Sequence, residues 1–397
     1  MYSEFIKFVK SISPSVSCIP LHEPDFSGNE REYVLDTINS TFVSSVGKYV
    51  DRFEEQFASY VGSKFAIATV NGTAALHVAL VLAGVGRSDE VITQSLTFIA
   101  TCNAIHYCNA EPIFVDIDNE SLGISPRALN NFLQHETTQR NNLCVNKTSG
   151  KVIRACVPMH TFGMPSKVDE IKSICDRHNI AMIEDAAESL GSFYKGQHTG
   201  TFGLLGAFSF NGNKIITTGG GGMIVTNDEV LAKKAKHITT TAKLSRPWSY
   251  CHDEIGFNYR LPNINAALGL AQLEQLNFKL EKKRKLACIY NDFFTAYPDI
   301  DFIREYKNAR SNYWLNTIIL PAKDKRDEFL EITNQNGLMT RSAWNLMSNT
   351  DMYKNSQSDD LCNTRSLANR LVNIPSSPGL IRNHVSNACD ESFALSN

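Results

Sequence analysis

The chain has little net charge, no long apolar run and no paired cysteines. Its 397 residues carry a formal net charge of −2, which leaves no basic surplus for a nucleic-acid backbone or an anionic membrane surface. No stretch of about 18 apolar residues could span a bilayer, and residues 1–10 mix charged with apolar side chains, unlike a signal peptide. We therefore expect no nucleic-acid partner, no membrane partner and a cytoplasmic location.

Cysteine and histidine are present, but not in the spacing of metal ligands. The ten cysteines are scattered and never form a CxxC pair, whereas structural zinc requires closely spaced ligands. A disulfide framework is typical of short secreted chains, which this is not. The ten histidines form no HExxH motif. We expect mostly reduced thiols and no metal site.

Apolar segments alternate with helical patterns through much of the chain. Strands are predicted at residues 65–69, 91–93, 112–116, 152–157 and 181–184, and helices at 73–82, 100–107 and 166–178. This alternation is typical of an α/β fold with a mostly parallel sheet covered on both faces. Residues 134–149 are polar and predict a loop.

The pattern changes after about residue 262. Residues 263–290 predict one long helix that bridges two domains, and the residues beyond it predict a smaller α+β unit. We therefore predict a large α/β domain over residues 20–262 and a small domain over 263–397, to which residues 1–19 contribute. Residues 383–397 have weak periodicity and predict an exposed tail.

Lys214 has the most informative surroundings in the sequence. Ser209 stands five residues before it, and four glycines follow at 219–222. An upstream apolar strand ends in Asp185, an acid suited to keeping a ring nitrogen protonated. A reactive amine and a buried acid are what pyridoxal phosphate (PLP) chemistry requires. A solvated lysine and a helix N-cap acid are the alternative interpretations.

The segment Gly72-Thr73-Ala74 suits the phosphate of such a cofactor. It stands where a predicted strand gives way to a helix, and the first N–H groups of a helix bind anions. Ser209 would complete the cradle from the other side. A plain helix cap is the alternative interpretation.

Two side chains follow strands at the end where sheet ligands bind. Phe98 follows the strand at 91–93 and suits a wall for the cofactor ring, although a core phenylalanine would give the same pattern. His160 follows the strand at 152–157 and is either within reach of the site or structural.

As a set and in this order, the segments resemble the DegT/DnrJ/StrS family of PLP-dependent nucleotide-sugar aminotransferases, which have the aspartate aminotransferase-like architecture of PLP fold type I. The matching stretches cover most of residues 20–380: Asn71–His77, Thr97–Thr101, Pro112–Asp116, Val157–Gly163, Glu184–Glu188, Phe208–Lys214 and Gly256–Arg260. Residues 22–26 and 42–47 are most similar to the branch that serves legionaminic-acid and related diamino-sugar pathways.

The resemblance implies a role for each candidate residue. Lys214 would form the Schiff base and move protons, Asp185 would pair with the ring nitrogen, and Phe98 would stack on the ring. The phosphate would be held by Gly72, Thr73, Ala74 and Ser209.

Three more residues take their expected roles from the same resemblance. Glu188 would lie near the phenolic oxygen, where many relatives have Gln or His, and an acid there should raise its own pKa or that of the Schiff base. Asn258 would reach the phosphate of a second subunit in a homodimer, and Arg260 on the same loop would contact the substrate. Asn71 stands where Ser is commoner.

The predicted function is transfer of an amino group from an amino acid, by resemblance glutamate, to a nucleotide-linked 4-keto-6-deoxyhexose. A dehydratase or eliminating enzyme on the same fold is one alternative, although family dehydratases have His where this chain has Lys214. A non-catalytic nucleotide-sugar-binding protein is the other, although it would have no use for a reactive amine.

Overall fold

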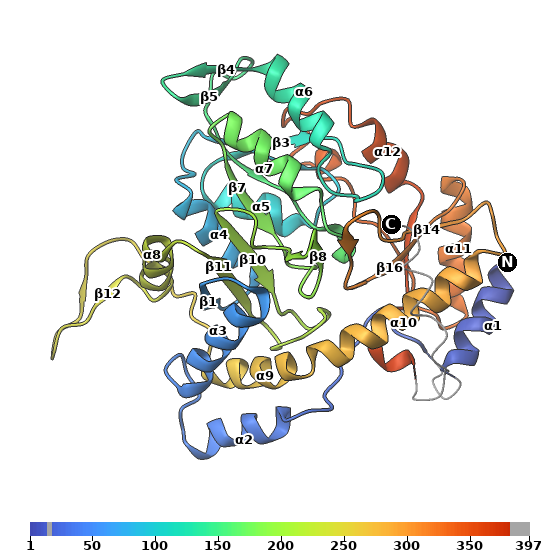
Figure 1. Cartoon of the computed structure of the whole chain (residues 1–397), viewed down its shortest axis with the longest axis horizontal. Helices are drawn as coiled ribbons and strands as arrows, with labels where there is room; N and C mark the ends of the chain where they lie inside the picture. Colours follow the sequence, from blue (N-terminus) through green and yellow to red (C-terminus); the bar gives the residue numbers. More distant parts are fainter. Residues whose placement is uncertain (14–17, 382–397) are drawn as a thin grey trace.

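A seven-stranded sheet forms the centre of the larger part of the molecule (Figure 1). The computed structural model describes residues 1–13 and 18–381, so the tail predicted at 383–397 lies outside the described residues. The five neighbouring strands β10, β7, β6, β2 and β3 pair in parallel. Strand β11 runs antiparallel to both of its neighbours, β1 and β10. The strand order is β1 (Phe65–Thr69), β11 (Gly222–Thr226), β10 (Leu205–Ser209), β7 (Ala181–Asp185), β6 (Ile153–Val157), β2 (Glu90–Gln94) and β3 (Glu111–Val115).

Helices cover both faces of this sheet, because its strands are apolar on both sides. Within β1, Ile67 packs toward one layer while Ala66 and Ala68 pack toward the other. The first layer contains α4 (Gly72–Leu82), α5 (Ile99–Tyr107) and α8 (Glu229–Thr239). The opposite face is covered by α3 (Lys48–Val61), α6 (Pro126–Glu136), α7 (Val168–Arg177) and α9 (Asn263–Glu274). The predicted α/β fold with a mostly parallel sheet is confirmed.

A second sheet of antiparallel strands forms the smaller part of the molecule. It contains β14 (Asp301–Phe302), β16 (Asn316–Ile319), β18 (Leu371–Ile374) and β17 (Arg341–Ser342). Its apolar cluster includes side chains of α1 (Tyr2–Ile12), α10 (Leu276–Phe294) and α11 (Lys323–Gln335). Residues near the N-terminus therefore pack with the last part of the described chain.

One carboxylate ties the two sheets together. Asp116, directly after β3, accepts hydrogen bonds from the backbone and hydroxyl of Thr364 at 2.7 Å each and from the backbone of Asn363 at 2.9 Å. These groups belong to the first turn of α12 (Cys362–Ala368), whose N–H groups have no partner within the helix. The end of the large sheet thus caps a helix of the small unit.

Two local predictions are wrong. Residues 134–149 contain the end of α6 and a hairpin of β4 (Thr137–Arg140) and β5 (Leu143–Asn146) rather than a loop. The prediction failed because most side chains of the segment are polar, and the buried Cys144 and Val145 are too few to give a strand pattern. The long helix at 263–290 is interrupted at Gln275, where Gly28 packs against its side chain. That contact brings in α2 (Glu30–Asn39), from a distant part of the sequence.

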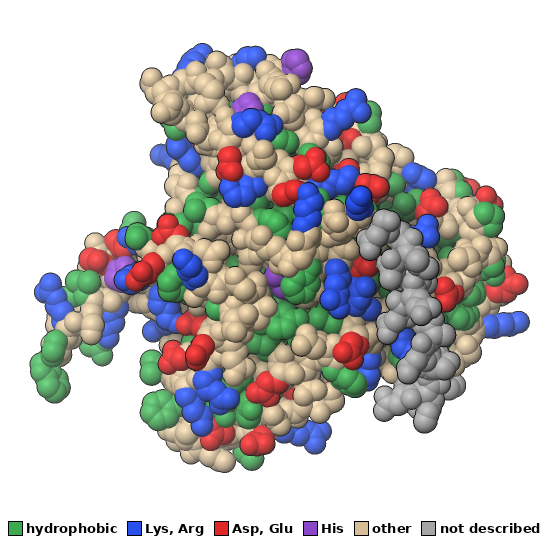
Figure 2. Space-filling view, viewed as in Figure 1, with side chains coloured by type: hydrophobic (Ala, Val, Ile, Leu, Met, Phe, Trp, Pro, Cys, Tyr) green, Lys and Arg blue, Asp and Glu red, His purple; other side chains and the backbone are tan. Residues whose placement is uncertain are grey.

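A narrow arm projects from the body next to α8 (Figure 1). It is built by the short strands β12 (Lys243–Leu244) and β13 (Cys251–His252), and its tip carries the fully exposed Trp248. Figure 2 shows apolar side chains at the end of this arm. The remaining short strands are β8 (Phe193–Tyr194), β9 (Gln197–His198) and β15 (Ala309–Arg310), which form a separate small sheet. Among the described helices, none is both long and apolar enough to cross a membrane.

Candidate active site

A pocket of about 230 Å³ opens at the carboxyl edge of the large sheet. Because β1, β2, β6, β7 and β10 run in the same direction, the loops after them meet at one edge. Most of the candidate residues line this pocket, and they come from four separate stretches of sequence: Gly72, Thr73, Phe98, Asp185, Glu188, Ser209 and Lys214.

Lys214 is held inside the pocket by two side chains. Its Nζ lies 3.2 Å from Oε1 of Glu188 and 4.0 Å from the ring centroid of Trp314, so the ammonium has an anion and an aromatic face as partners. The indole of Trp314 donates to the carbonyl of Asn213 at 2.7 Å, which holds the loop that carries the lysine. With a side chain only 12% exposed, Lys214 is not a solvated surface residue.

Glu188 is buried beside this lysine. Its second oxygen accepts a hydrogen bond from the backbone of Phe162 at 2.9 Å. Burial raises the pKa of Glu188 to about 7, against the opposing effects of Lys214 and the Phe162 N–H. The carboxyl group can therefore gain or lose a proton close to neutral pH.

Asp185 ends β7 and faces the pocket from the floor. Its carboxylate accepts from the Thr101 hydroxyl at 2.7 Å and from the backbone of Ala187 at 3.2 Å. Burial raises the pKa of Asp185, and these hydrogen bonds together with Lys214 and His160 lower it. A cation bound in front of this side chain would favour its ionised form.

The start of α4 supplies the features of an anion site. Asn71 caps the helix by accepting from the backbone of Ala74 at 2.7 Å, which leaves the N–H groups of Gly72 and Thr73 at the mouth of the first turn. A Cβ at Gly72 would lie 2.7 Å from Cβ of Ser209, so only glycine lets α4 approach β10 this closely. The Ala74 N–H points instead to Asn71, and Ala74 is not among the lining residues.

His160 lies behind the pocket rather than in its wall. It is fully buried, its Nδ1 accepts from the backbone of Ser166 at 3.0 Å, and its Nε2 lies 3.1 Å from Glu184. Because Nδ1 accepts a hydrogen bond, Nε2 carries the proton and donates to Glu184. Both ring nitrogens are occupied, so a substrate contact through His160 would require one of these bonds to break.

Asn258 and Arg260 lie outside the pocket of their own chain, on the segment that returns from the arm. The guanidinium of Arg260 donates to Oδ1 of Asn258 at 2.9 and 3.1 Å. Asn258 is exposed, although its segment runs along β1 through a bridge between Thr69 and Arg260.

Two tryptophans in the pocket wall were not predicted. Trp314 and Trp344 come from the small unit and meet the large sheet only in the folded chain. Trp344 packs on Phe162 with ring centroids 4.9 Å apart and lies 6.2 Å from Phe98. The chain has only three tryptophans, and the third stands at the tip of the arm. The scarcity of tryptophan was the one signal in the sequence that could have drawn attention to these two residues.

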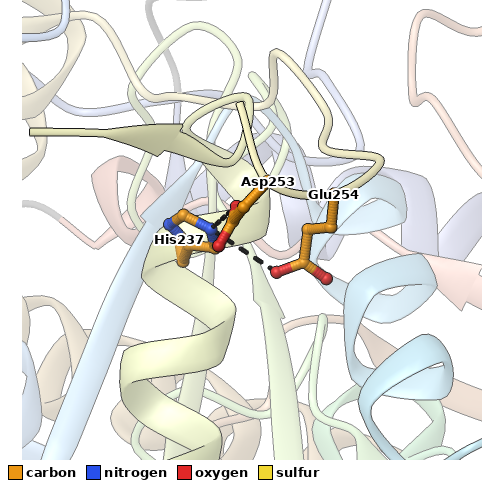
Figure 3. Close-up of side chains that lie close together, drawn as sticks. All are labelled: His237, Asp253 and Glu254. Atoms are coloured by element: carbon orange, nitrogen blue, oxygen red, sulfur yellow. Dashed lines mark hydrogen bonds and ion pairs between the residues drawn. The ribbon is translucent and has the colours of Figure 1, made fainter. Parts of the chain in front are cut away.

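Among the described residues, one group of side chains has the donor types of a metal site (Figure 3). His237 on α8 contacts Asp253 at 2.6 Å and Glu254 at 3.4 Å, and the Lys234 ammonium pairs with Glu254. The lysine supplies the positive charge that a metal would bring, so the group acts as an ion-pair cluster at the base of the arm.

Comparison with known proteins agrees with this geometry. The sequence profile of the DegT/DnrJ/EryC1/StrS aminotransferase family matches residues 24–392. EpsN of Bacillus subtilis (strain 168), named as a pyridoxal phosphate-dependent aminotransferase, is 40% identical over 82% of this chain and 81% of its own. GDP-perosamine synthase of Escherichia coli O157:H7 is 36% identical over 94% of this chain and 97% of its own. The crystal structure of a DegT DnrJ EryC1 StrS aminotransferase from Brucella abortus superposes with a TM-score of 0.80 at 26% identity, over 88% of this chain and 90% of its own.

Proposed function

The chain belongs to the DegT/DnrJ/EryC1/StrS aminotransferase family, and from this premise we propose that it aminates a nucleotide-linked keto sugar with PLP as cofactor. The observation that carries the proposal is the pairing of Lys214 and Glu188 in a pocket that also contains Asp185 and the start of α4. An amine, an acid and an anion site are the three groups that this cofactor requires of a protein.

The residues present fit the cofactor. The N–H groups of Gly72 and Thr73, with the hydroxyls of Thr73 and Ser209, would hold its phosphate. Asp185 would keep its ring nitrogen protonated, and Phe98 would form one wall for the ring. When bound, PLP supplies the electron sink for the carbanion formed at the substrate carbon.

Lys214 has two tasks in this proposal. Its amine anchors the cofactor at the cofactor's aldehyde carbon, and once displaced it takes a proton from the donor's α-carbon and returns a proton to the sugar carbon. Glu188, at 3.2 Å, stabilises the ammonium form and can exchange a proton with it. Trp314 excludes water from one side of the amine.

The full reaction joins two halves. In the first half an amino acid, which we take to be glutamate, would give up its amino group and depart as the corresponding 2-oxo acid, with Lys214 taking the proton from its α-carbon. The keto carbon of a nucleotide-linked 4-keto-6-deoxyhexose then receives that amino group, while its oxygen leaves as water. The name of one relative, GDP-perosamine synthase, makes guanosine-linked sugars the first substrates to test.

We further propose that the active unit is a homodimer. The arm carries Trp248 and Tyr250, whose side chains are 102% and 86% exposed. Apolar surface of this kind is stabilised by burial against a partner. At the base of the arm, Asn258 would then extend to the phosphate of the second copy, with Arg260 toward its substrate.

A product assay tests the proposal. The purified protein is offered glutamate with guanosine- and uridine-linked 4-keto-6-deoxyhexoses, and the products are identified by mass and NMR. An amino sugar formed together with one equivalent of 2-oxoglutarate supports it. A deoxygenated sugar without nitrogen would indicate elimination instead. A protein that binds the sugars, takes up no PLP and forms no product would be a binding protein.

A further inference from the structure

We propose that Thr101 and Thr97 are positioning residues that keep the Asp185 carboxylate ionised and aimed into the pocket. Neither Thr97 nor Thr101 is among the residues that line the pocket, so both act through Asp185. The inference rests on the proposed cofactor site, because a cofactor ring nitrogen is the group that Asp185 would serve. It does not depend on which sugar is aminated.

The three side chains form a buried chain of hydrogen bonds. Oγ1 of Thr101 lies 2.7 Å from Oδ2 of Asp185, and Oγ1 of Thr97 lies 2.8 Å from Oγ1 of Thr101. Both threonines are 0% exposed and Asp185 is 5% exposed. Thr101 is in the first turn of α5 and Thr97 just precedes that helix, so one short segment aligns both hydroxyls with the end of β7.

The direction of each hydrogen bond follows from counting hydrogens. An ionised carboxylate only accepts, so Thr101 donates its single hydroxyl hydrogen to Asp185. Thr101 must then accept a hydrogen bond from Thr97, so the single hydroxyl hydrogen of Thr97 is used in that bond. In the reverse order a protonated Asp185 would donate to Thr101, and Thr97 would be left to donate to Sδ of Met159 at 2.9 Å.

The order that ends on the carboxylate is the more stable one. Hydrogen bonds to a charged acceptor are roughly twice as strong as neutral ones, whereas a thioether is a weak acceptor. A donor that is itself hydrogen-bonded is also polarised and strengthened. The two hydroxyls therefore favour the ionised form of Asp185.

This stabilisation matters because the other groups around Asp185 do less to favour its ionised form. Burial raises its pKa, and the Thr101 bond opposes that effect more than the Ala187 N–H, Lys214 or His160 does. From α5 the neighbouring thiol of Cys102 also faces Asp185, and burial and that carboxylate raise the pKa of this thiol. Glu188, on the other side, is a second acid. Without the threonines, Asp185 would take up a proton at a higher pH.

The test compares Thr101→Val with Thr101→Ser. Valine keeps the branched shape and removes the hydroxyl, and serine keeps the hydroxyl and removes the methyl group. PLP is titrated into cofactor-free full-length protein between pH 5 and 9, and binding is followed by the fluorescence of Trp314 and Trp344, which line the pocket. The readout is the pH midpoint below which PLP affinity falls.

We expect Thr101→Val to raise this midpoint by about one pH unit, which is about tenfold in affinity at the acid end. Thr101→Ser should keep the wild-type midpoint, and Thr97→Val should shift it in the same direction by less. An unshifted midpoint in Thr101→Val overturns the inference, as does an equal shift in the serine variant, which would point to lost packing. If Thr101→Val does not fold, the presence or absence of a shift in Thr97→Val decides.

The outcome is separable from that of the proposed function. A protein that aminates no sugar but shows these shifts retains the threonine relay on a PLP site with another substrate. A protein that aminates the sugar with unshifted midpoints keeps its function and loses the relay. Wild-type protein that binds no PLP at any pH contradicts both.

Discussion

Lys214 and Glu188 form an ion pair that burial makes sensitive to pH. A lysine held against a buried carboxyl group has its charge stabilised only while that group is ionised. The charge that faces the Lys214 ammonium therefore depends on a proton that Glu188 gains or loses near neutrality. This coupling operates at the scale of single atoms and is best tested by single substitutions.

Lys214→Ala should abolish amination while the fold survives, because the side chain contributes one ion pair and one aromatic contact. We expect turnover to fall by at least about 10² to 10⁴, the usual contribution of a general base. Borohydride should no longer fix the cofactor to the chain, as measured by mass spectrometry. Lys214→Arg is the matched control, because it keeps a cation beside Glu188 without a nucleophilic amine. Cofactor still fixed to the alanine variant would place the covalent site elsewhere.

Glu188→Gln should remove a transition near neutral pH. Below its pKa of about 7 the wild-type side chain is neutral, and above it a negative charge lies 3.2 Å from Lys214. Glutamine keeps the shape and can still accept from the Phe162 N–H, but cannot titrate. Absorbance of the bound cofactor from pH 5.5 to 9 should show a step near pH 7 in wild type and none in the variant. The same step in both proteins would assign it to another group.

The sequence pointed to pocket residues whose neighbours along the chain carry a signal, although their predicted roles remain predictions. Asp185 follows an apolar strand, and Lys214 follows a hydroxyl and precedes glycines, so short patterns sufficed to select them. Trp314 and Trp344 follow no such pattern. They reach the pocket from the small unit, and that contact depends on packing between distant segments.

At the scale of elements, the pocket depends on how closely α4 approaches β10. Five of the seven strands of the large sheet were predicted, because buried strands are continuous apolar runs, whereas β10 and β11 were not. The break between α9 and α10 was not predicted, because it lies where Gln275 meets Gly28, a residue distant in the sequence. Local pattern therefore places the elements, and tertiary contacts determine where they bend.

Gly72→Ala should damage the anion site more than the fold. The added methyl would lie 2.7 Å from Cβ of Ser209, which forces the start of α4 away from β10. We expect PLP affinity to fall by about tenfold or more and stability to drop by about 1–3 kcal/mol, the usual cost of overpacking. Fluorescence titration and urea unfolding measure the two effects. Gly212→Ala is the control, since its Cβ would have no heavy atom within 4 Å. Equal losses in both variants would contradict the packing argument.

At the scale of the whole molecule, the arm is the feature that a single chain does not explain. Replacing both Trp248 and Tyr250 by serine should weaken self-association, because it removes exposed aromatic area that we propose a partner covers. Sedimentation should give twice 44.2 kDa for wild type and a dissociating species for the variant. Val230→Ser, an exposed position 75% accessible on α8, should leave association unchanged. A double variant that remains fully dimeric would remove the arm tip from the interface.

The small unit also contains a buried lysine, beside the ends of β16 and β18. Lys283 on α10 is fully buried and donates to the carbonyls of Trp314 at 3.1 Å and Ser376 at 2.6 Å. Burial lowers its pKa well below the usual value. A neutral amine has two hydrogens, enough for these two carbonyls, and we therefore predict that the folded protein holds Lys283 uncharged. In the unfolded chain the same side chain is protonated up to about pH 10.4.

Stability should therefore rise with pH through this lysine. Between its folded and unfolded pKa the unfolded chain binds one more proton, so the free energy of unfolding increases by up to about 1.4 kcal/mol per pH unit. Lys283→Met should lose that increment, and Lys233→Met, at a side chain 75% exposed, should keep it. Urea unfolding of cofactor-free protein at pH 7, 8 and 9, at one protein concentration, measures the difference between variants. If wild type and Lys283→Met show the same slope, Lys283 is charged in the folded state and donates to the two carbonyls as an ammonium.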